Sequence, residues 1–176
     1  TPDLASTVAQ ELEGEIVAHS QFGTAKLQID ETVIDLAMAR RESYEYPGAL
    51  PRVSPGSIQE DLARRDFTIN ALAISLAPGS WGDLLDPFNG QRDLRDGLIR
   101  VLHPRSFVDD ATRLFRAIRY AERLGFKHEA TTEELTMRDL SHLGTIKGDR
   151  IRHEFERMFH ESRAASMLKR AQELGV

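Results

Sequence analysis

The fold is decided by residues 15–39, EIVAHSQFGTAKLQIDETVIDLAMA, which hold three short runs of β-forming residues. The runs are 15–19, 24–29 and 32–39. Asp30 and Glu31 separate the last two runs and suit a tight hairpin turn. The preceding residues 2–13 carry leucine and valine at a spacing of four, which predicts an amphipathic helix. A helix followed by consecutive strands indicates an α+β fold with a mainly antiparallel sheet.

The following segments alternate between loop, helix and short strand. Residues 41–57 contain three prolines and two glycines and read as one long irregular stretch, which is either a functional loop or plain mobile surface. A helical pattern then runs to about Leu76 and ends at a Pro-Gly pair. Apolar runs at 84–85 and 98–102 predict short strands.

Beyond residue 104 the pattern is helical. Helices are expected at 107–124, 131–140 and 149–174. We therefore divide the chain into an α+β part over residues 1–104 and an all-helical part over residues 105–176.

The composition of the 176-residue chain excludes several classes of protein. No apolar run approaches the roughly 20 residues that a membrane-spanning helix needs. The lack of cysteine excludes disulfides, thiol catalysis and cysteine-ligated zinc, and is compatible with the cytoplasmic location that we expect. A net charge of −5 argues against a protein that coats nucleic acid with an overall basic surface.

The charge is nevertheless uneven along the chain. Residues 1–62 hold 11 acidic and 4 basic residues, whereas residues 100–123 hold six arginines. An arginine-rich segment of this kind either binds a polyanion locally or forms a solvated helix face.

The most informative segment is DDATRLFRAIRYA at 109–121. Its charged residues recur every three positions and so lie along one side of the expected helix. They are Asp110, Arg113, Arg116 and Arg119. Asp110 and Arg113 together offer the acceptors and donors that hydrogen-bond the edge of a nucleobase, and the later arginines suit phosphate oxygens. On spacing alone, the alternative is an intrahelical ion pair with further arginines on the surface.

A second charged segment is EDLARRDFTINAL at 60–72. Asp66 is placed to cap the expected helix, and Arg65 beside that helix N-terminus would favour a phosphate. The alternative is a capped helix whose Arg64 and Arg65 are only solvated.

Asp35 lies between Ile34 and Leu36 in the third β-rich run. A carboxylate buried in an apolar strand must be paired or bind a metal ion, so Asp35 is a third candidate site residue. Strand alternation also allows its side chain to point into solvent.

Taken together, the motifs and their order resemble the class II branch of the tRNA nucleotidyltransferase and poly(A) polymerase family, within the DNA polymerase beta superfamily. The matching stretches are QFGTA (21–25), IDLAMARRE (34–42), YPGALP (46–51), RRDFTINALA (64–73), LDPFNG (85–90) with Asp93 and Leu94, IRV (99–101), DDATRLFRAIRYA (109–121), LGF (124–126) and RIRHE (150–154). The resemblance covers nearly the whole chain.

The resemblance implies template-independent addition of CCA, or of its terminal A, to the 3′ end of tRNA from CTP and ATP. It implies a nucleotidyltransferase head over residues 1–104 and a helical neck over 105–176 that recognises the base and binds RNA. Asp110 and Arg113 would read the base, and Arg65, Arg116 and Arg119 would contact the nucleotide. Residues 86–94 would hinge head and neck, and the 41–57 stretch would help the switch from cytosine to adenine. Asp35 matches a catalytic carboxylate.

The chain also departs from the family pattern. The Asp-X-Asp pair that binds Mg²⁺ in the family would lie ahead of residue 1, and the family's C-terminal body and tail would lie beyond residue 176. In two-metal phosphoryl transfer such ions neutralise developing charge and activate the attacking hydroxyl. We therefore expect the 176-residue chain alone to be inactive. A poly(A) polymerase and a non-catalytic nucleotide- or RNA-binding module are the alternative functions.

Overall fold

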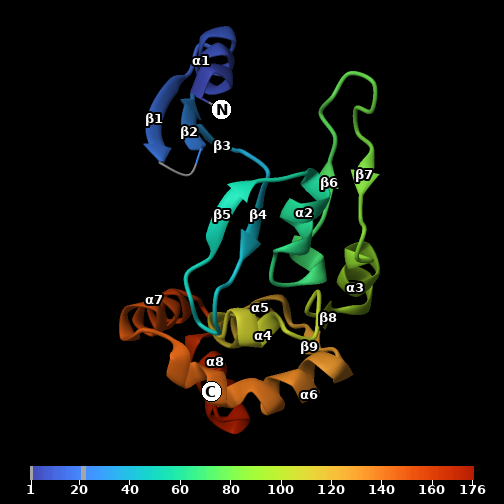
Figure 1. Ribbon diagram of the computed structural model, residues 1–176, viewed down its shortest axis with the longest axis vertical. Coiled ribbons are helices and arrows are strands. Elements are labelled where there is room, and N and C mark those ends of the chain that lie inside the picture. The colour runs from blue at the N-terminus through green and yellow to red at the C-terminus, as the bar shows by residue number, and fades with distance from the viewer. Residues whose placement is uncertain (1, 21–22) are drawn as a thin grey trace. The chain divides into compact units, whose positions relative to one another are not determined.

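The computed structural model describes residues 2–20 and 23–176 (Figure 1). Two compact units are formed, one from Thr1–Glu42 with Val53–Asp61 and the other from Ser43–Arg52 with Leu62–Val176. Helices and mainly antiparallel strands are mixed, as expected for an α+β fold. The division proposed at residue 104 coincides with no edge of these units, so head and neck segments remain predictions.

The first unit packs one helix against a three-stranded sheet. α1 (Pro2–Glu11) precedes β1 (Glu15–Ser20), β2 (Thr24–Ile29) and β3 (Thr32–Ala37), which pair antiparallel in the order β1–β2–β3. The buried interior consists of Ala5, Ala9, Ala25 and Leu27. In the β2–β3 turn Asp30 has φ 50°, a left-handed conformation that aspartate tolerates. The predicted helix, strands and turn are confirmed, while Gln21 and Phe22 of the QFGTA motif lie outside the described residues.

The stretch expected to be irregular contains a hairpin. β4 (Arg40–Ser43) and β5 (Arg52–Pro55) form a two-stranded sheet and leave residues 44–51 as the connecting loop. The prolines and Gly48 lie in this loop or at the end of β5, where strand pairing does not need an N–H from proline, and the Gly56 N–H extends the pairing by donating to the Ala39 carbonyl at 3.0 Å. α2 (Ile58–Ala63) follows with a reciprocal cap: Glu60 accepts the Ser57 N–H at 2.7 Å, and Ser57 Oγ accepts the Glu60 N–H at 3.2 Å.

The prediction of a helix that runs to about Leu76 is wrong. The described residues form instead one 3₁₀ turn, η1 (Thr68–Asn70), and then β6 (Ala73–Ile74), which pairs antiparallel with β7 (Leu84–Leu85). The cause is a long-range contact: Phe67 bridges to Val101, and the Thr68 N–H donates to the Arg100 carbonyl at 2.9 Å. This extended pairing fixes the backbone where the helix would have begun, and local periodicity carries no sign of it. The strand at 84–85 is confirmed.

The rest of the second unit is helical apart from one short parallel strand pair, β8 with β9. In order, the elements are α3 (Gly90–Asp96), β8 (Leu98–Ile99), α4 (Ser106–Asp109), α5 (Thr112–Leu124), β9 (Lys127–His128), α6 (Ala130–Asp139), η2 (Leu140–Thr145), α7 (Gly148–Phe159) and α8 (Ala164–Leu174). Helices α7 and α8 both pack against α5. The fully buried side chains include Phe107, Leu114, Ile118, Met158 and Met167.

Two of the expected helices are broken. The 107–124 helix is interrupted at Asp110, whose backbone is extended (φ −144°, ψ 98°), so Asp110 precedes α5 and is not part of it. The 149–174 helix is interrupted between α7 and α8. A continuous helix there would be about 39 Å long, whereas α5 is about 20 Å. The chain turns between α7 and α8, and both Met158 of α7 and Met167 of α8 therefore lie in the core beside α5.

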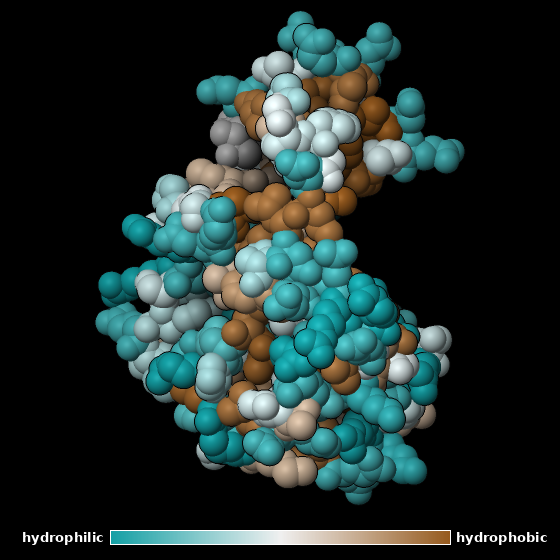
Figure 2. All heavy atoms as spheres, turned by 90° about the vertical axis from the view of Figure 1, so that its right-hand side faces the viewer, coloured by the Kyte–Doolittle hydropathy of each residue, from teal (hydrophilic) through white to brown (hydrophobic). Residues whose placement is uncertain are grey.

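The β6–β7 hairpin carries exposed apolar side chains. They are Ile74, Leu76, Trp81 and Leu84. Figure 2 views the molecule from the side on which Figure 1 draws this hairpin, and hydrophobic atoms form patches on the surface there. No helix among the described residues has the length and apolar character of a membrane span.

Candidate functional site

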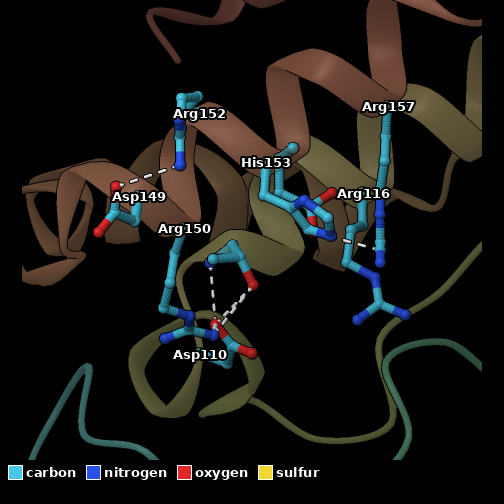
Figure 3. Close-up of a pocket in the computed structure, with 9 residues that line it drawn as sticks. Asp110, Arg116, Asp149, Arg150, Arg152, His153 and Arg157 are labelled. Atoms are coloured by element: carbon cyan, nitrogen blue, oxygen red, sulfur yellow. Dashed lines mark hydrogen bonds and ion pairs between the residues drawn. The ribbon is translucent and has the colours of Figure 1, made fainter.

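A cavity of about 360 Å³ lies in the second unit, between the N-terminal half of α5 and one face of α7. It is lined by Asp110, Thr112, Arg116, Asp149, Arg150, Arg152, His153, Glu154 and Arg157. Figure 3 shows Arg150 extending from α7 toward Asp110, with Arg116 and Arg157 on the other side of the view. Four arginines face three carboxylates, so the lining is locally basic.

Asp110 sits at the break between α4 and α5, where it is held from three directions. Its Oδ1 accepts the Thr112 backbone N–H at 3.0 Å, the Thr112 hydroxyl at 2.7 Å and Arg150 Nη2 at 2.8 Å. All three bonds use the same oxygen, and no hydrogen bond among the described residues uses Asp110 Oδ2. The carboxylate is therefore fixed in orientation while one of its oxygens stays available as an acceptor.

Arg116 is the second predicted residue in the cavity. Its Nη2 lies 2.6 Å from Oδ2 of the buried Asp66. Burial by itself would lower the pKa of Arg116, but Asp66, Tyr120 and Glu154 raise it above its ordinary value. Arg116 therefore remains a cation at one wall of the cavity. Asp66, expected to cap a helix, serves instead as the anchor of this guanidinium.

Arg113 and Arg119 are buried and bonded to other parts of the chain. Arg113 donates to Ser106 Oγ at 2.9 Å and to the Arg64 carbonyl at 2.8 Å. Arg119 lies 3.5 Å from Glu161 and stacks on Tyr120, with 4.8 Å between its Cζ and the ring centroid. Neither side chain lines the cavity, so the expected row of ligand-facing charges is not continuous. The expected Asp110–Arg113 couple is also not formed, because the two side chains bond in different directions.

Arg65 and Asp35 lie elsewhere. Arg65 is exposed and donates to the Asn70 carbonyl at 3.2 Å. Asp35 belongs to the first unit, where its side chain is 69% exposed and lies 3.3 Å from Lys26 Nζ on the facing strand. Strand alternation therefore points Asp35 into solvent. Roles for both residues in a site remain predictions.

The α7 face supplies residues to which sequence reasoning gave no role. Arg150, His153 and Arg157 are spaced by three and four positions and so share one side of the helix, next to Arg152. The segment contains the RIRHE motif at 150–154. The three- and four-residue spacing of its basic residues was the sequence signal that would have placed them together in the site. Arg152 is 70% exposed, with carboxylates no nearer than 3.4 Å. It is thus available to an anion.

The described residues do not fit a bound magnesium ion. Across residues 2–20 and 23–176 no group of three or more histidine, aspartate or glutamate side chains could hold a metal. Asp35 faces a lysine rather than a second carboxylate. We therefore derive no chemical step through a metal ion from these residues.

The arrangement is suited to a small anionic ligand that has a hydrogen-bond donor at one end. Its volume lies within the range of about 300–1,000 Å³ usual for ligand sites. Asp110 Oδ2 would accept the donor, and Arg116, Arg152 and Arg157 could meet phosphate oxygens.

Comparison with known proteins gives these features a family context. Residues 2–100 match the family model described as Poly A polymerase head domain. The A-adding tRNA nucleotidyltransferase of Halalkalibacterium halodurans is 41% identical, over 98% of this chain and 42% of that relative.

Two solved structures share the fold. The apo form II of a CCA-adding enzyme matches with a TM-score of 0.94 and 41% identity, over 99% of this chain and 42% of that one. A tRNA nucleotidyltransferase complexed with a primer tRNA and an incoming ATP analog matches with a TM-score of 0.85 and 39% identity, over 98% and 48%. The chain thus spans less than half the length of these relatives.

Proposed function

Since the chain belongs to the Poly A polymerase head domain family, we propose that it is part of an enzyme that adds nucleotides to the 3′ end of tRNA without a nucleic-acid template. Its similarity to an A-adding enzyme and to a structure holding primer tRNA with an ATP analog supports this proposal. The nucleotides are ATP and, if the enzyme builds the whole CCA end, also CTP.

The observation that carries the proposal is the fixed Asp110 carboxylate with its available Oδ2 in a cavity lined by arginines. Adenine and cytosine each present an exocyclic amino group next to a ring nitrogen, whereas uracil presents no amino group. Asp110 Oδ2 accepts a hydrogen bond from that amino group. Arg116, Arg152 and Arg157 then hold the triphosphate with charge-assisted bonds.

Arg113 contributes indirectly in the arrangement described. It ties Ser106 of α4 to the Arg64 carbonyl and so holds the chain on both sides of Asp110 in place. A direct contact between Arg113 and the base, as the family resemblance implies, requires its guanidinium to leave these partners.

Binding of ATP, CTP and UTP to the 176-residue chain, measured by calorimetry at one fixed salt concentration, tests the nucleotide site. We expect ATP or CTP to bind at least tenfold more tightly than UTP. Asp110→Asn should remove most of that preference, because the amide group of asparagine can present a donor, instead of an acceptor, to the amino group of the base. Equal affinity for all three nucleotides in the wild type would overturn the base-reading assignment.

The reaction itself is tested in the complete protein that the gene encodes. Incorporation of labelled AMP into tRNA ending in CC supports an A-adding activity, and incorporation of CMP and AMP into tRNA lacking CCA supports a CCA-adding one. Preference for an oligo(A) primer would identify a poly(A) polymerase instead. Nucleotide binding with no incorporation on any primer would leave a non-catalytic binding module.

A further inference from the structure

A second cavity, of about 380 Å³, lies in the same unit beside the first. Its walls come from the loop between β4 and β5 and from the segment that leads into α7 (Figure 1). The lining residues are Glu45, Tyr46, Gly48, Ala49, Leu50, Arg52, Thr145, Lys147, Asp149 and Arg150. Asp149 and Arg150 line both cavities, so the two spaces are neighbours across a shared wall.

The loop is seated against the helical segment at Gly48. Gly48 has φ +77°, and a Cβ at this position would overlap Thr145 Oγ1 and lie 2.9 Å from the Thr145 carbonyl oxygen. Ala49 is buried, and its N–H donates to the Tyr46 carbonyl at 3.1 Å, which closes a turn. This cavity therefore has a defined wall on the loop side.

Two large side chains stand exposed on that wall. Tyr46 is 64% exposed and Leu50 is 73% exposed, although both line the cavity. An exposed aromatic ring beside an apolar side chain offers a stacking surface for a nucleobase, because every base has an apolar face.

Three cations and two carboxylates, Glu45 and Asp149, line the cavity around this stacking surface. Lys147 is exposed and has no ion-pair partner in the part of the chain that the structure describes. Arg52 is 76% exposed and pairs at 2.8 Å with Glu45, which is 61% exposed, so solvent screens the interaction strongly. Arg150 completes the set from the shared wall. An aromatic platform with flexible cations at its rim is the usual combination for single-stranded nucleic acid.

We propose that the second cavity binds the single-stranded 3′ end of the RNA acceptor, with a terminal base stacked on Tyr46 and its phosphodiester near Lys147 and Arg52. The inference rests on the proposed function, because the shared wall, Asp149 and Arg150, places this nucleotide next to the proposed nucleotide site. Each cavity has a volume suited to one nucleotide. Charge and stacking favour RNA over a peptide as the occupant.

The test measures fluorescence anisotropy of a short single-stranded RNA ending in CC with the 176-residue chain. We expect Tyr46→Ala to weaken RNA binding about tenfold and Tyr46→Phe to bind like the wild type, because the ring alone carries stacking. Trp81→Ala is the matched control: Trp81 is 71% exposed on the β6–β7 hairpin and lies outside the cavity lining, so this variant should bind RNA as the wild type does. Lys147→Gln should reduce the slope of log affinity against log salt by about 0.7.

ATP binding by the same variants separates this inference from the proposed function. We expect Tyr46→Ala and Lys147→Gln to bind ATP within about twofold of the wild type. If the wild type binds RNA but no nucleotide, and Tyr46→Ala loses the RNA, the proposed nucleotide site fails while the RNA subsite stands. If Tyr46→Ala and Lys147→Gln bind RNA as tightly as the wild type, or the wild type binds none, the RNA subsite is overturned. Circular dichroism melting of each variant checks that these exposed substitutions leave the fold intact.

Discussion

Arg150 and Asp110 lie 40 positions apart, yet Arg150 Nη2 donates to Asp110 Oδ1 at 2.8 Å. The bond connects α7 to the break between α4 and α5, and both residues line the first cavity (Figure 3). Because the Arg150 and Thr112 bonds all use Oδ1, they fix the direction of the other carboxylate oxygen. The orientation of the Asp110 carboxylate thus depends on a helix far from it in sequence.

Arg150→Gln should weaken ATP binding about tenfold and lower the free energy of unfolding by about 1 kcal/mol, since a charge-assisted bond to a half-buried carboxylate is lost. Calorimetry with ATP and urea unfolding measure the two effects. Arg152→Gln is the control for stability: its side chain is 70% exposed, and its loss should cost less than about 0.5 kcal/mol. Equal unfolding energies for Arg150→Gln and Arg152→Gln would mean that the Asp110 bond does not stabilise the fold.

Arg113→Ala should destabilise the protein by about 2–4 kcal/mol, because Arg113 is buried and its loss removes the hydrogen bonds to the Ser106 hydroxyl and the Arg64 carbonyl. Urea unfolding followed by circular dichroism measures the loss. Arg105→Ala provides the comparison, since Arg105 is 69% exposed and pairs with Asp109 in the next turn, which predicts a change below about 0.5 kcal/mol. A loss below about 1 kcal/mol for Arg113→Ala would show that the bonds from Arg113 to Ser106 and Arg64 do not act as a structural tie.

Local sequence pattern was sufficient for α1 and the β1–β2–β3 sheet of the first unit, but not for the β4–β5 hairpin, most of which also belongs to that unit. The β2–β3 hairpin alternates buried and exposed residues with a turn-forming Asp30, and the neighbouring strand and helix follow the same simple periodicities. Nothing distant along the chain overrides these preferences. The exposure of Asp35, which was the alternative to its predicted role as a site residue, agrees with the same alternation.

The second unit was harder to predict because long-range contacts decide it. Phe67 pairs with Val101 and blocks a helix that periodicity favours. The even spacing of Arg113, Arg116 and Arg119 concealed their different environments, since the partners that bury Arg113 and Arg119 come from other segments. The site was therefore half predicted: Asp110 and Arg116 were identified, and the α7 residues were quoted without a role.

The free energy of unfolding should fall as the pH decreases from about 7.5 to about 5.5, partly because of His128. Burial lowers the pKa of His128 below its ordinary value of 6.5, and Arg170 acts in the same direction; Glu133, Glu122 and the Ala117 backbone oppose the shift without reversing it. Below pH 6.5 the unfolded chain therefore takes up the proton before the folded chain does, so acid favours unfolding.

The measurement is urea unfolding across this pH range for the wild type and His128→Gln. The variant should show a weaker pH dependence than the wild type, because the remaining titratable groups, including His103, are common to both proteins. Identical pH profiles would show that His128 does not contribute to the acid sensitivity.

Gly48→Ala should detach the β4–β5 loop from the helical segment. A Cβ at this position would overlap Thr145 Oγ1, and the backbone with φ +77° is itself unfavourable for alanine by about 1–2 kcal/mol. Limited trypsin digestion should therefore cut after Arg52 several times faster in the variant than in the wild type, because a released loop is more accessible to the protease. Gly144→Ala is the control: Gly144 directly precedes Thr145 in sequence, but its Cβ would have no atom within 4 Å, so digestion should remain at the wild-type rate. If both variants are cut at the wild-type rate, the contact between Gly48 and Thr145 does not hold the loop, and the second cavity loses its fixed wall.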